Sequence, residues 1–350
     1  MGYSGHSNPR RDPHPPYQKN RTWRNFDTTR RVGGSDEALT TIIVFAQKQE
    51  TIIMLPSTKR TDSHVHFYTS QDLRRVAGSL PYTLPEPHPL TAYLDTLIDA
   101  GITPTLINNV HLSILPDSEN VFASFEELKN LQATDPLRYG DVKLVGTIKA
   151  EPAYATQARL WHPQVIGARI VLHDARPETV SDTQFSDGQW SALYARLLPH
   201  QHLHIYAKEA ETNLRVLRQI PRNVRVIIDH LGTCHHERDI TEPAYIALLT
   251  EARERGNVWF KGPGYRTSVH PEETARFVMQ IVCAVGADKI LLEATDAPHV
   301  GTDNKGVPYS ALFNPNNAFS FVDAVAQHVS TETRIPVGQL LRGASGQWVR

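Results

Sequence analysis

The sequence predicts an α/β protein folded as a (β/α)8 (TIM) barrel behind a disordered N-terminal extension. Two observations support the barrel. From residue 61 onward, short apolar runs rich in β-branched residues alternate with helical patterns, which is typical of a parallel sheet. Eight such runs occur, and eight is the number of strands that closes this kind of barrel.

The strands and helices are expected in regular alternation. The runs expected to form strands are 61–66, 102–107, 142–148, 167–172, 203–207, 224–230, 257–261 and 289–295. Helical patterns are expected at 89–100, 123–133, 187–198, 209–219, 242–255 and 271–285. Pro104 lies inside the second run and weakens that strand prediction, because proline cannot donate to a ladder. We therefore expect one barrel domain over residues 61–350.

The first 60 residues differ in composition from the rest of the chain. Residues 1–40 carry arginines among Pro, Gly, Ser and Asn without any periodicity, which predicts a disordered basic tail. This tail lacks the apolar stretch of a secretory signal. Residues 41–44 and 51–55 are apolar and β-branched. They are expected to form two short strands within a lead-in segment over 41–60.

Composition excludes several classes of function. The 36 basic and 37 acidic residues give a net charge of −1, which offers no support for a nucleic-acid partner. Cys234 and Cys283 lie far apart and suggest neither a disulfide framework nor a zinc knuckle, so a reducing, cytoplasmic compartment is expected. No apolar run approaches the roughly 18 residues that span a bilayer. The sequence leaves the oligomeric state open.

Polar residues gather where the predicted strands end, which is where such barrels place their active sites. His64 and His66 stand at alternate positions of the first strand and therefore share one face. The other polar candidates at strand ends are Arg169, Arg176, His204, Tyr206, His230, Arg266, Asp296 and His299. Six strand ends thus carry groups that could converge on one cavity with a small-molecule substrate.

Four motifs in order resemble the amidohydrolase superfamily, in its amidohydrolase-related, metal-dependent-hydrolase-like branch. They are Asp62-Ser63-His64-Val65-His66, Gly167-Ala168-Arg169, Ile228-Asp229-His230-Leu231-Gly232 and Thr295-Asp296-Ala297-Pro298-His299. The resemblance covers about residues 54–350. Within that branch the chain is most similar to the 2-pyrone-4,6-dicarboxylate lactonases, through Tyr206, Tyr265-Arg266, Arg169 and Arg176. Those enzymes hydrolyse a cyclic ester in aromatic compound catabolism, and the resemblance implies such a reaction here.

The resemblance bears on whether a metal takes part. Metal-dependent members bind through the strand-one histidines, a strand-five histidine and the strand-eight aspartate. Tyr206 aligns with that strand-five histidine, and a neutral phenol is a poor zinc ligand. Lactonases of the resembled type work without metal, so a metal-independent reaction is expected. If the register is shifted by two residues, His204 would complete a zinc site with His64, His66 and Asp296.

The metal-free mechanism assigns a role to each candidate. Asp296 would act as general base on a water molecule that attacks the lactone carbonyl. His64, His66 and His230 would aim N–H groups at the carbonyl oxygen as negative charge develops there. The residues expected to bind the substrate are Arg169, Arg176, Tyr206 and Arg266. Asp62 and Asp229 are expected on the opposite face, in supporting roles, and for Asp229 this follows from alternation with His230.

One departure from the resembled lactonases bears on the substrate. Those enzymes carry an arginine after the strand-six His-x-Gly, where this chain has Thr233. A lactone with one acid group, a sulfonated lactone or a sugar-derived lactone is therefore as reasonable as a dicarboxylate. Two other functions stay open. One is a zinc-dependent decarboxylase or hydrolase on the same fold, and the other is a catalytically inactive barrel that acts as a binding protein.

Overall fold

The computed structural model describes residues 58–76, 86–172, 175–234, 240–262, 266–298 and 315–344. The predicted tail over 1–40 and the predicted strands at 41–44 and 51–55 lie outside the described residues. So do Tyr265 and His299.

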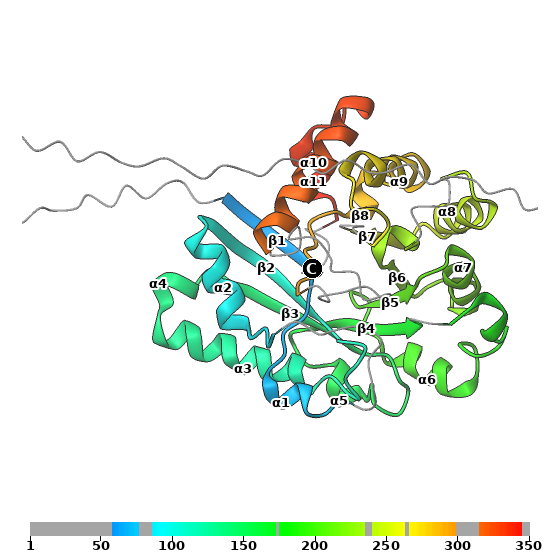
Figure 1. Cartoon of the computed structure of the whole chain (residues 1–350). Coiled ribbons are helices and arrows are strands. Elements are labelled where there is room, and N and C mark those ends of the chain that lie inside the picture. Colours follow the sequence, from blue (N-terminus) through cyan, green and yellow to red (C-terminus); the bar gives the residue numbers. More distant parts are fainter. Residues whose placement is uncertain are drawn as a thin grey trace, which may run out of the picture. The chain divides into compact units, whose positions relative to one another are not determined.

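Eight parallel strands follow one another in chain order around a nearly closed barrel, which confirms the predicted fold (Figure 1). They are β1 (Thr58–Val65), β2 (Ile102–Val110), β3 (Lys143–Lys149), β4 (Val165–Leu172), β5 (His202–Ala207), β6 (Arg225–Ile228), β7 (Val258–Lys261) and β8 (Ile290–Leu291). Pro104 occupies β2, where it pairs with Arg60 of β1. β8 is much shorter than the predicted run over 289–295, because the chain leaves the ladder after Leu291.

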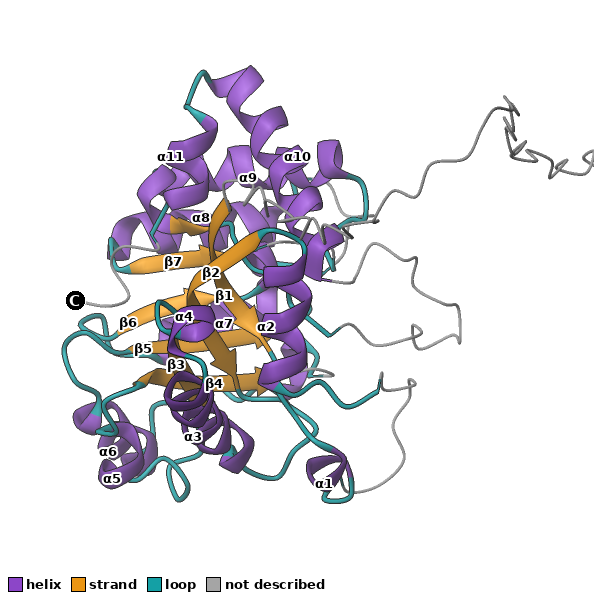
Figure 2. Cartoon of the chain, turned by 90° about the vertical axis from the view of Figure 1, so that its left-hand side faces the viewer, coloured by secondary structure: helices purple, strands orange, loops and turns teal. Residues whose placement is uncertain are grey.

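Helices surround the sheet, as Figure 2 shows. They are α1 (Ser70–Leu73), α2 (Leu90–Asp99), α3 (Glu119–Thr134), α4 (Pro136–Tyr139), α5 (Gln157–Leu160), α6 (Gly188–Arg196), α7 (Ala210–Gln219), α8 (Pro243–Arg255), α9 (Pro271–Val285), α10 (Pro315–Thr333) and α11 (Val337–Arg342). Three 3-10 turns are η1 (Pro177–Thr179), η2 (His230–Gly232) and η3 (Ala287–Lys289). Among the described helices, none is both long and apolar enough to cross a membrane.

Local sequence explains the helix boundaries. Pro243 and Pro271 stand at the first positions of α8 and α9, where the missing amide hydrogen costs nothing. Gly256 ends α8 in the left-handed conformation at φ 70°. Asp187 accepts a hydrogen bond from the Trp190 amide and so caps α6. The six predicted helices form where they were expected, and these signals explain the boundaries of α6, α8 and α9.

The barrel interior is filled below the C-terminal strand ends. Six different strands contribute one side chain each to an apolar cluster, which Ala344 joins: Leu106, Val145, Ile166, Ile227, Trp259 and Leu291. The Ala344 amide donates to the carbonyl of Ile290 at 2.9 Å, so the segment after α11 is tied to β8. This apolar layer makes the interior a packed core, and the buried His202 ring meets its Trp259 edge-on at 5.4 Å.

The contact that closes the barrel, between β8 and β1, differs from the ladders between the other neighbouring strands. In the described part of the chain, these two regions share one isolated bridge, between Val65 and Ala297, in place of a ladder. The Asp296 amide donates to the His64 carbonyl at 2.7 Å, and the His66 amide donates to the Ala297 carbonyl at 2.8 Å. The segment that follows β8 therefore completes the barrel, and it brings Asp296 beside the two histidines.

Candidate active site

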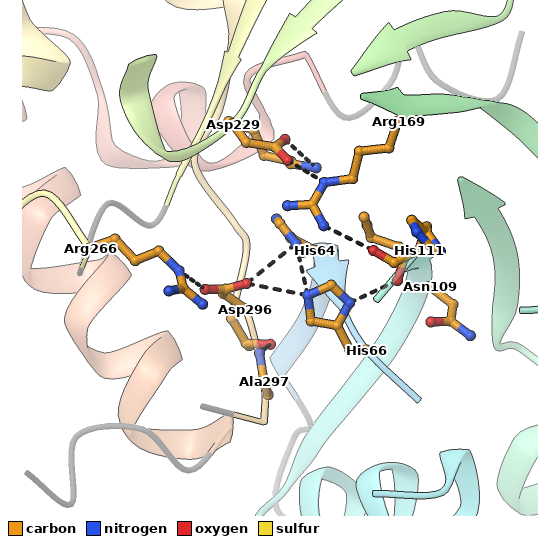
Figure 3. A network of polar contacts seen from close by, with 12 residues as sticks. His64, His66, Asn109, His111, Arg169, Asp229, Arg266, Asp296 and Ala297 are labelled. Carbon is orange, nitrogen blue, oxygen red and sulfur yellow. Dashed lines mark hydrogen bonds and ion pairs between the residues drawn. The ribbon is translucent and has the colours of Figure 1, made fainter. Parts of the chain in front are cut away.

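His64 and His66 form the centre of the site (Figure 3). His64 lies in β1 and His66 directly follows it, and both side chains are buried. Their Nε2 atoms are 3.2 Å apart. His66 Nδ1 lies 2.7 Å from the carbonyl oxygen of Val110 and must donate to it. A neutral His66 ring therefore carries its lone pair on Nε2, where it faces the site as an acceptor.

Asp296 faces both imidazoles from the other side of the β8–β1 junction. Its Oδ1 lies 3.3 Å from His64 Nε2 and 3.6 Å from His66 Nε2. Its Oδ2 accepts a hydrogen bond from Arg266 Nε at 3.0 Å. Burial by itself would raise the pKa of Asp296, but the Arg266 guanidinium and the surrounding imidazoles together outweigh it and hold that pKa well below its ordinary value. Asp296 is therefore ionised at neutral pH.

His230 enters the site through a left-handed turn. Its φ is 51° and that of Leu231 is 56°, so the strand geometry ends at Ile228. The His230 ring stacks on His64 with centroids 5.3 Å apart and meets the Tyr206 ring edge-on at 4.9 Å. Burial lowers the pKa of His230 to about 3, so the ring is neutral at pH 7.

This turn also corrects one expectation drawn from strand alternation. Alternation placed Asp229 on the face opposite to His230. In the structure both residues offer a ligand atom within 4.8 Å of His64, so both point into the barrel. The reason is that His230 begins η2, where the period-two rule of a strand no longer applies.

Below the histidines lies a buried network of charges. Arg169 donates from Nε to Asp229 Oδ2 at 2.8 Å and from Nη1 to the His111 carbonyl at 2.9 Å. Lys261 Nζ lies 2.8 Å from Asp229 Oδ1 and 3.2 Å from His204 Nδ1. Desolvation opposes ionisation of Asp229, but Lys261 and Arg169 hold its pKa well below the ordinary value. Two cations therefore share one carboxylate beneath the site.

The sequence did not lead us to predict Lys261 as a site residue, although its side chain is fully buried. Strand alternation could have identified it, because Lys261 follows Trp259 by two positions in β7 and so shares its inward face. His111 was missed as well, since the second strand was predicted to end at residue 107. β2 continues to Val110 and carries Asn109 and His111 to the site end of the barrel (Figure 3).

The remaining predicted residues differ in their placement. Tyr206 is buried, and the Arg169 guanidinium lies 5.2 Å from its ring centroid. The Arg266 side chain is 22% exposed where it meets Asp296. Arg176 is exposed immediately before η1. The structure thus brings Tyr206 and Arg266 to the cluster, while the described contacts give Arg176 no partner in it.

The donor set also fits a metal ion. His64, His66 and Asp296 each offer one ligand atom, and these atoms all lie within 4.8 Å of one another. The hydrogen bond from His66 Nδ1 to a carbonyl is the arrangement that orients many metal-bound histidines. His204 does not join this group, because its Nδ1 faces the Lys261 ammonium. The expected four-residue zinc set is therefore represented by three residues.

Comparisons with known proteins find a matching sequence family and similar folds. A family model described as "Amidohydrolase" matches residues 61–306. No curated protein matches the sequence.

Solved structures extend the comparison. A probable 2-pyrone-4,6-dicarboxylic acid hydrolase from Acinetobacter baumannii, with citric acid bound, has 15% identity and a TM-score of 0.61 over 82% of this chain and 99% of that one. A Pseudomonas putida protein with the same provisional description has 22% identity and a TM-score of 0.57, over 82% and 97%. An amidohydrolase from Burkholderia multivorans has 13% identity and a TM-score of 0.57, over 84% and 98%. At these identities the likeness shows the barrel fold.

Proposed function

Because the chain belongs to the amidohydrolase family, we propose that it is a hydrolase that opens a small carboxylated lactone similar to 2-pyrone-4,6-dicarboxylate. The observation that carries this proposal is the convergence of one ionised carboxylate, Asp296, with three imidazoles at the C-terminal end of the barrel. A fixed base beside fixed hydrogen-bonding groups is the equipment that ester hydrolysis requires. The descriptions of the Acinetobacter and Pseudomonas structures support the choice of a lactone.

The reaction uses one water molecule. Asp296 takes a proton from the water as its oxygen bonds to the lactone carbonyl carbon, and the carbonyl oxygen becomes negative. His64 and His230 donate N–H groups to that oxygen, and each such donor is typically worth about 3–4 kcal/mol in the transition state. Collapse of the intermediate restores the carbonyl and breaks the ring C–O bond. The proton held by Asp296 passes to the departing oxygen, which leaves an open-chain acid.

His66 was expected to be the third donor to the carbonyl oxygen, but we assign it a different role. Its Nδ1–H is engaged by Val110, so its Nε2 donates only when the ring is an imidazolium. Burial lowers the pKa of His66, which favours the neutral ring at pH 7. We assign the neutral Nε2 to the attacking water, which it orients together with Asp296 Oδ1, 3.6 Å away.

The basic residues would bind the substrate acid groups. A carboxylate that approaches the partly exposed Arg266 draws that guanidinium toward itself and weakens its hold on Asp296. Substrate binding would then raise the basicity of Asp296 when it is needed. Arg169, Arg176 and Tyr206 complete the proposed binding set. Arg169 is the most constrained of them, because Asp229 and the His111 carbonyl already hold its guanidinium.

A second candidate rests on the three ligand atoms of His64, His66 and Asp296. It is a zinc-dependent hydrolase or decarboxylase on the same barrel. Zinc held by these residues would polarise a substrate oxygen or activate a bound water. In that case Arg266 would orient the Asp296 carboxylate, and His230 would contact the substrate.

One experiment separates these candidates. The purified full chain is incubated with 2-pyrone-4,6-dicarboxylate, with a 2-pyrone carrying one carboxylate and with an uncharged lactone, and loss of ring absorbance is recorded before and after chelation. Elemental analysis accompanies it. We expect hydrolysis of a carboxylated lactone that survives the chelator. Stoichiometric zinc with chelator-sensitive activity would favour the second candidate, and no turnover of any lactone would contradict the lactonase proposal.

A matched pair of variants tests the assignment of the base. Asp296→Asn removes the carboxylate charge and should lower kcat by about 10²–10⁴-fold. Asp187→Asn is the control, because Asp187 caps α6 away from the site and asparagine caps equally well. Equal activity of the two variants would exclude Asp296 as the base.

A further inference from the structure

Within the described residues, the β8 and β1 regions meet without a ladder, and the site is built across this junction. Most neighbouring strands pair as ladders, such as the six register pairs that join β4 and β5. We call the junction between Asp62–His66 and Glu293–Ala297 the seam. In the described part of the chain it is joined by one isolated bridge and by three backbone hydrogen bonds of 2.7–2.8 Å. A junction with so few regular contacts needs another element to fix its register.

The two halves of the site belong to opposite sides of this seam. His64 and His66 stand on the β1 side, and Asp296 stands on the β8 side. The distances of 3.3 and 3.6 Å between them are therefore distances across the seam. A shift of about 1 Å at such a place can lower a rate about 10²-fold, because the reacting groups lose their alignment.

The Asp62 side chain bonds to both sides of the seam, just beyond the place where Glu293 accepts from the Thr61 amide. Asp62 Oδ1 accepts hydrogen bonds from the His64 amide at 3.0 Å and from the Thr295 amide at 2.9 Å. Asp62 Oδ2 accepts from the Thr295 hydroxyl and, at 2.6 Å, from the Tyr93 hydroxyl of α2. Asp62 is buried, so these four donors are its immediate surroundings. Three of the four donors belong to His64, which carries one imidazole, and to Thr295, which precedes the base.

From this arrangement we propose that Asp62 is a positioning residue, which fixes the base Asp296 against His64 and His66 by bonding both sides of the seam. Only a carboxylate accepts on both oxygens without donating. Asparagine at this position would accept from the two amides, but its NH₂ group would have to donate to the two hydroxyls, so four charge-assisted bonds would become weaker neutral ones. Asp62 touches neither substrate nor water in this role, and it acts through the backbone of its neighbours.

Hydrogen exchange measured by mass spectrometry tests the proposal without any substrate. In Asp62→Asn, the seam amides of Ser63, His66 and Asp296 should exchange about tenfold faster or more, while β4 and β5 amides keep their rates. Glu127→Gln is the control, because Glu127 also accepts two hydrogen bonds, both from Thr91, but lies on α3. Unchanged exchange at the seam in Asp62→Asn would overturn the proposal.

Two further variants separate positioning from simple stabilisation. Thr295→Val removes a donor that crosses the seam, whereas Tyr93→Phe removes one that ties Asp62 only to α2. Thr295→Val should speed exchange at the seam and Tyr93→Phe should not, even where both lower Tm equally. Equal seam exchange in the two variants would show that Asp62 serves stability alone.

Activity supplies the remaining readout, and this part rests on the proposed lactonase function. Asp62→Asn and Thr295→Val should lower kcat about 10–100-fold with KM changed less than about threefold, while Tyr93→Phe and Glu127→Gln keep kcat. An unchanged kcat in Asp62→Asn, with faster seam exchange, would overturn the link to catalysis. If the unaltered protein hydrolyses no lactone, the exchange result still decides whether Asp62 holds the seam.

Discussion

The buried network beneath the site makes an asymmetric prediction about stability. Asp229→Asn and Lys261→Met each remove one charge from the same contact, whose N···O distance is 2.8 Å. The two variants differ in the buried charges that remain. Asp229→Asn leaves Arg169 and Lys261, with side chains 3% and 0% exposed, without a carboxylate. Lys261→Met leaves the Arg169–Asp229 pair at 2.8 Å, which is neutral as a whole.

The expected changes in the free energy of unfolding follow from the charges that remain. Breaking a buried ion pair so that a charge is left uncompensated costs about 3–5 kcal/mol. Replacing buried charges by apolar groups of similar volume is often neutral when the remaining charges are balanced. Asp229→Asn should therefore lower the free energy of unfolding by at least about 2 kcal/mol more than Lys261→Met does.

Equilibrium urea unfolding of the two variants and the unaltered protein, followed by tryptophan fluorescence, measures this difference. Equal m-values would confirm that stability alone has changed. The double variant closes a thermodynamic cycle and gives the coupling between the two side chains. The reasoning is refuted if Lys261→Met proves as destabilising as Asp229→Asn, because the net positive charge of the network would then not matter.

Three further outcomes are expected. Arg266→Met should move the acid limb of kcat/KM to higher pH. The Arg266 guanidinium lowers the pKa of Asp296, so without it the base becomes protonated at a higher pH. An acid limb at an unchanged pH would contradict this. Burial raises the pKa of Glu293 to about 7 from 4.5, so the folded state holds a proton that the unfolded state has lost, and stability should fall as pH rises between these values. Glu293→Gln should flatten that slope in urea titrations at pH 5 and 7.5. Loading with zinc should raise Tm if His64 and His66 bind it, and His66→Ala should abolish the rise.

Much of the fold could be predicted because its signals are local. Each strand run was recognisable by β-branched residues, and the prolines and the glycine at the ends of α8 and α9 mark boundaries that depend on neighbours in sequence. The end of β8 could not be predicted in this way. Residues 292–295 remain buried and apolar in part, but their partners across the seam replace the ladder.

The site residues were predictable where side chains alternate regularly along a strand, and not where the backbone leaves strand geometry. His64 and His66 obey strand alternation. Asp62 has the same parity as His64 but bonds Tyr93 of α2, because the pairing of β1 with β2 is irregular between Asp62 and Val65. Asp229 does not, because the left-handed turn at His230 rotates the chain. Lys261 obeys parity but was overlooked, since a buried lysine is unusual and its carboxylate partner lies in a different strand.

The left-handed backbone at His230 and Asp296 sets function against stability. These residues have φ angles of 51° and 53°, a region that glycine adopts more readily than histidine or aspartate. Each such conformation costs about 1–3 kcal/mol, so two of the positions open to stabilisation are ones that the proposed chemistry uses. A library screened only for heat resistance would be drawn to glycine at Asp296 and would enrich barrels that lack the proposed base.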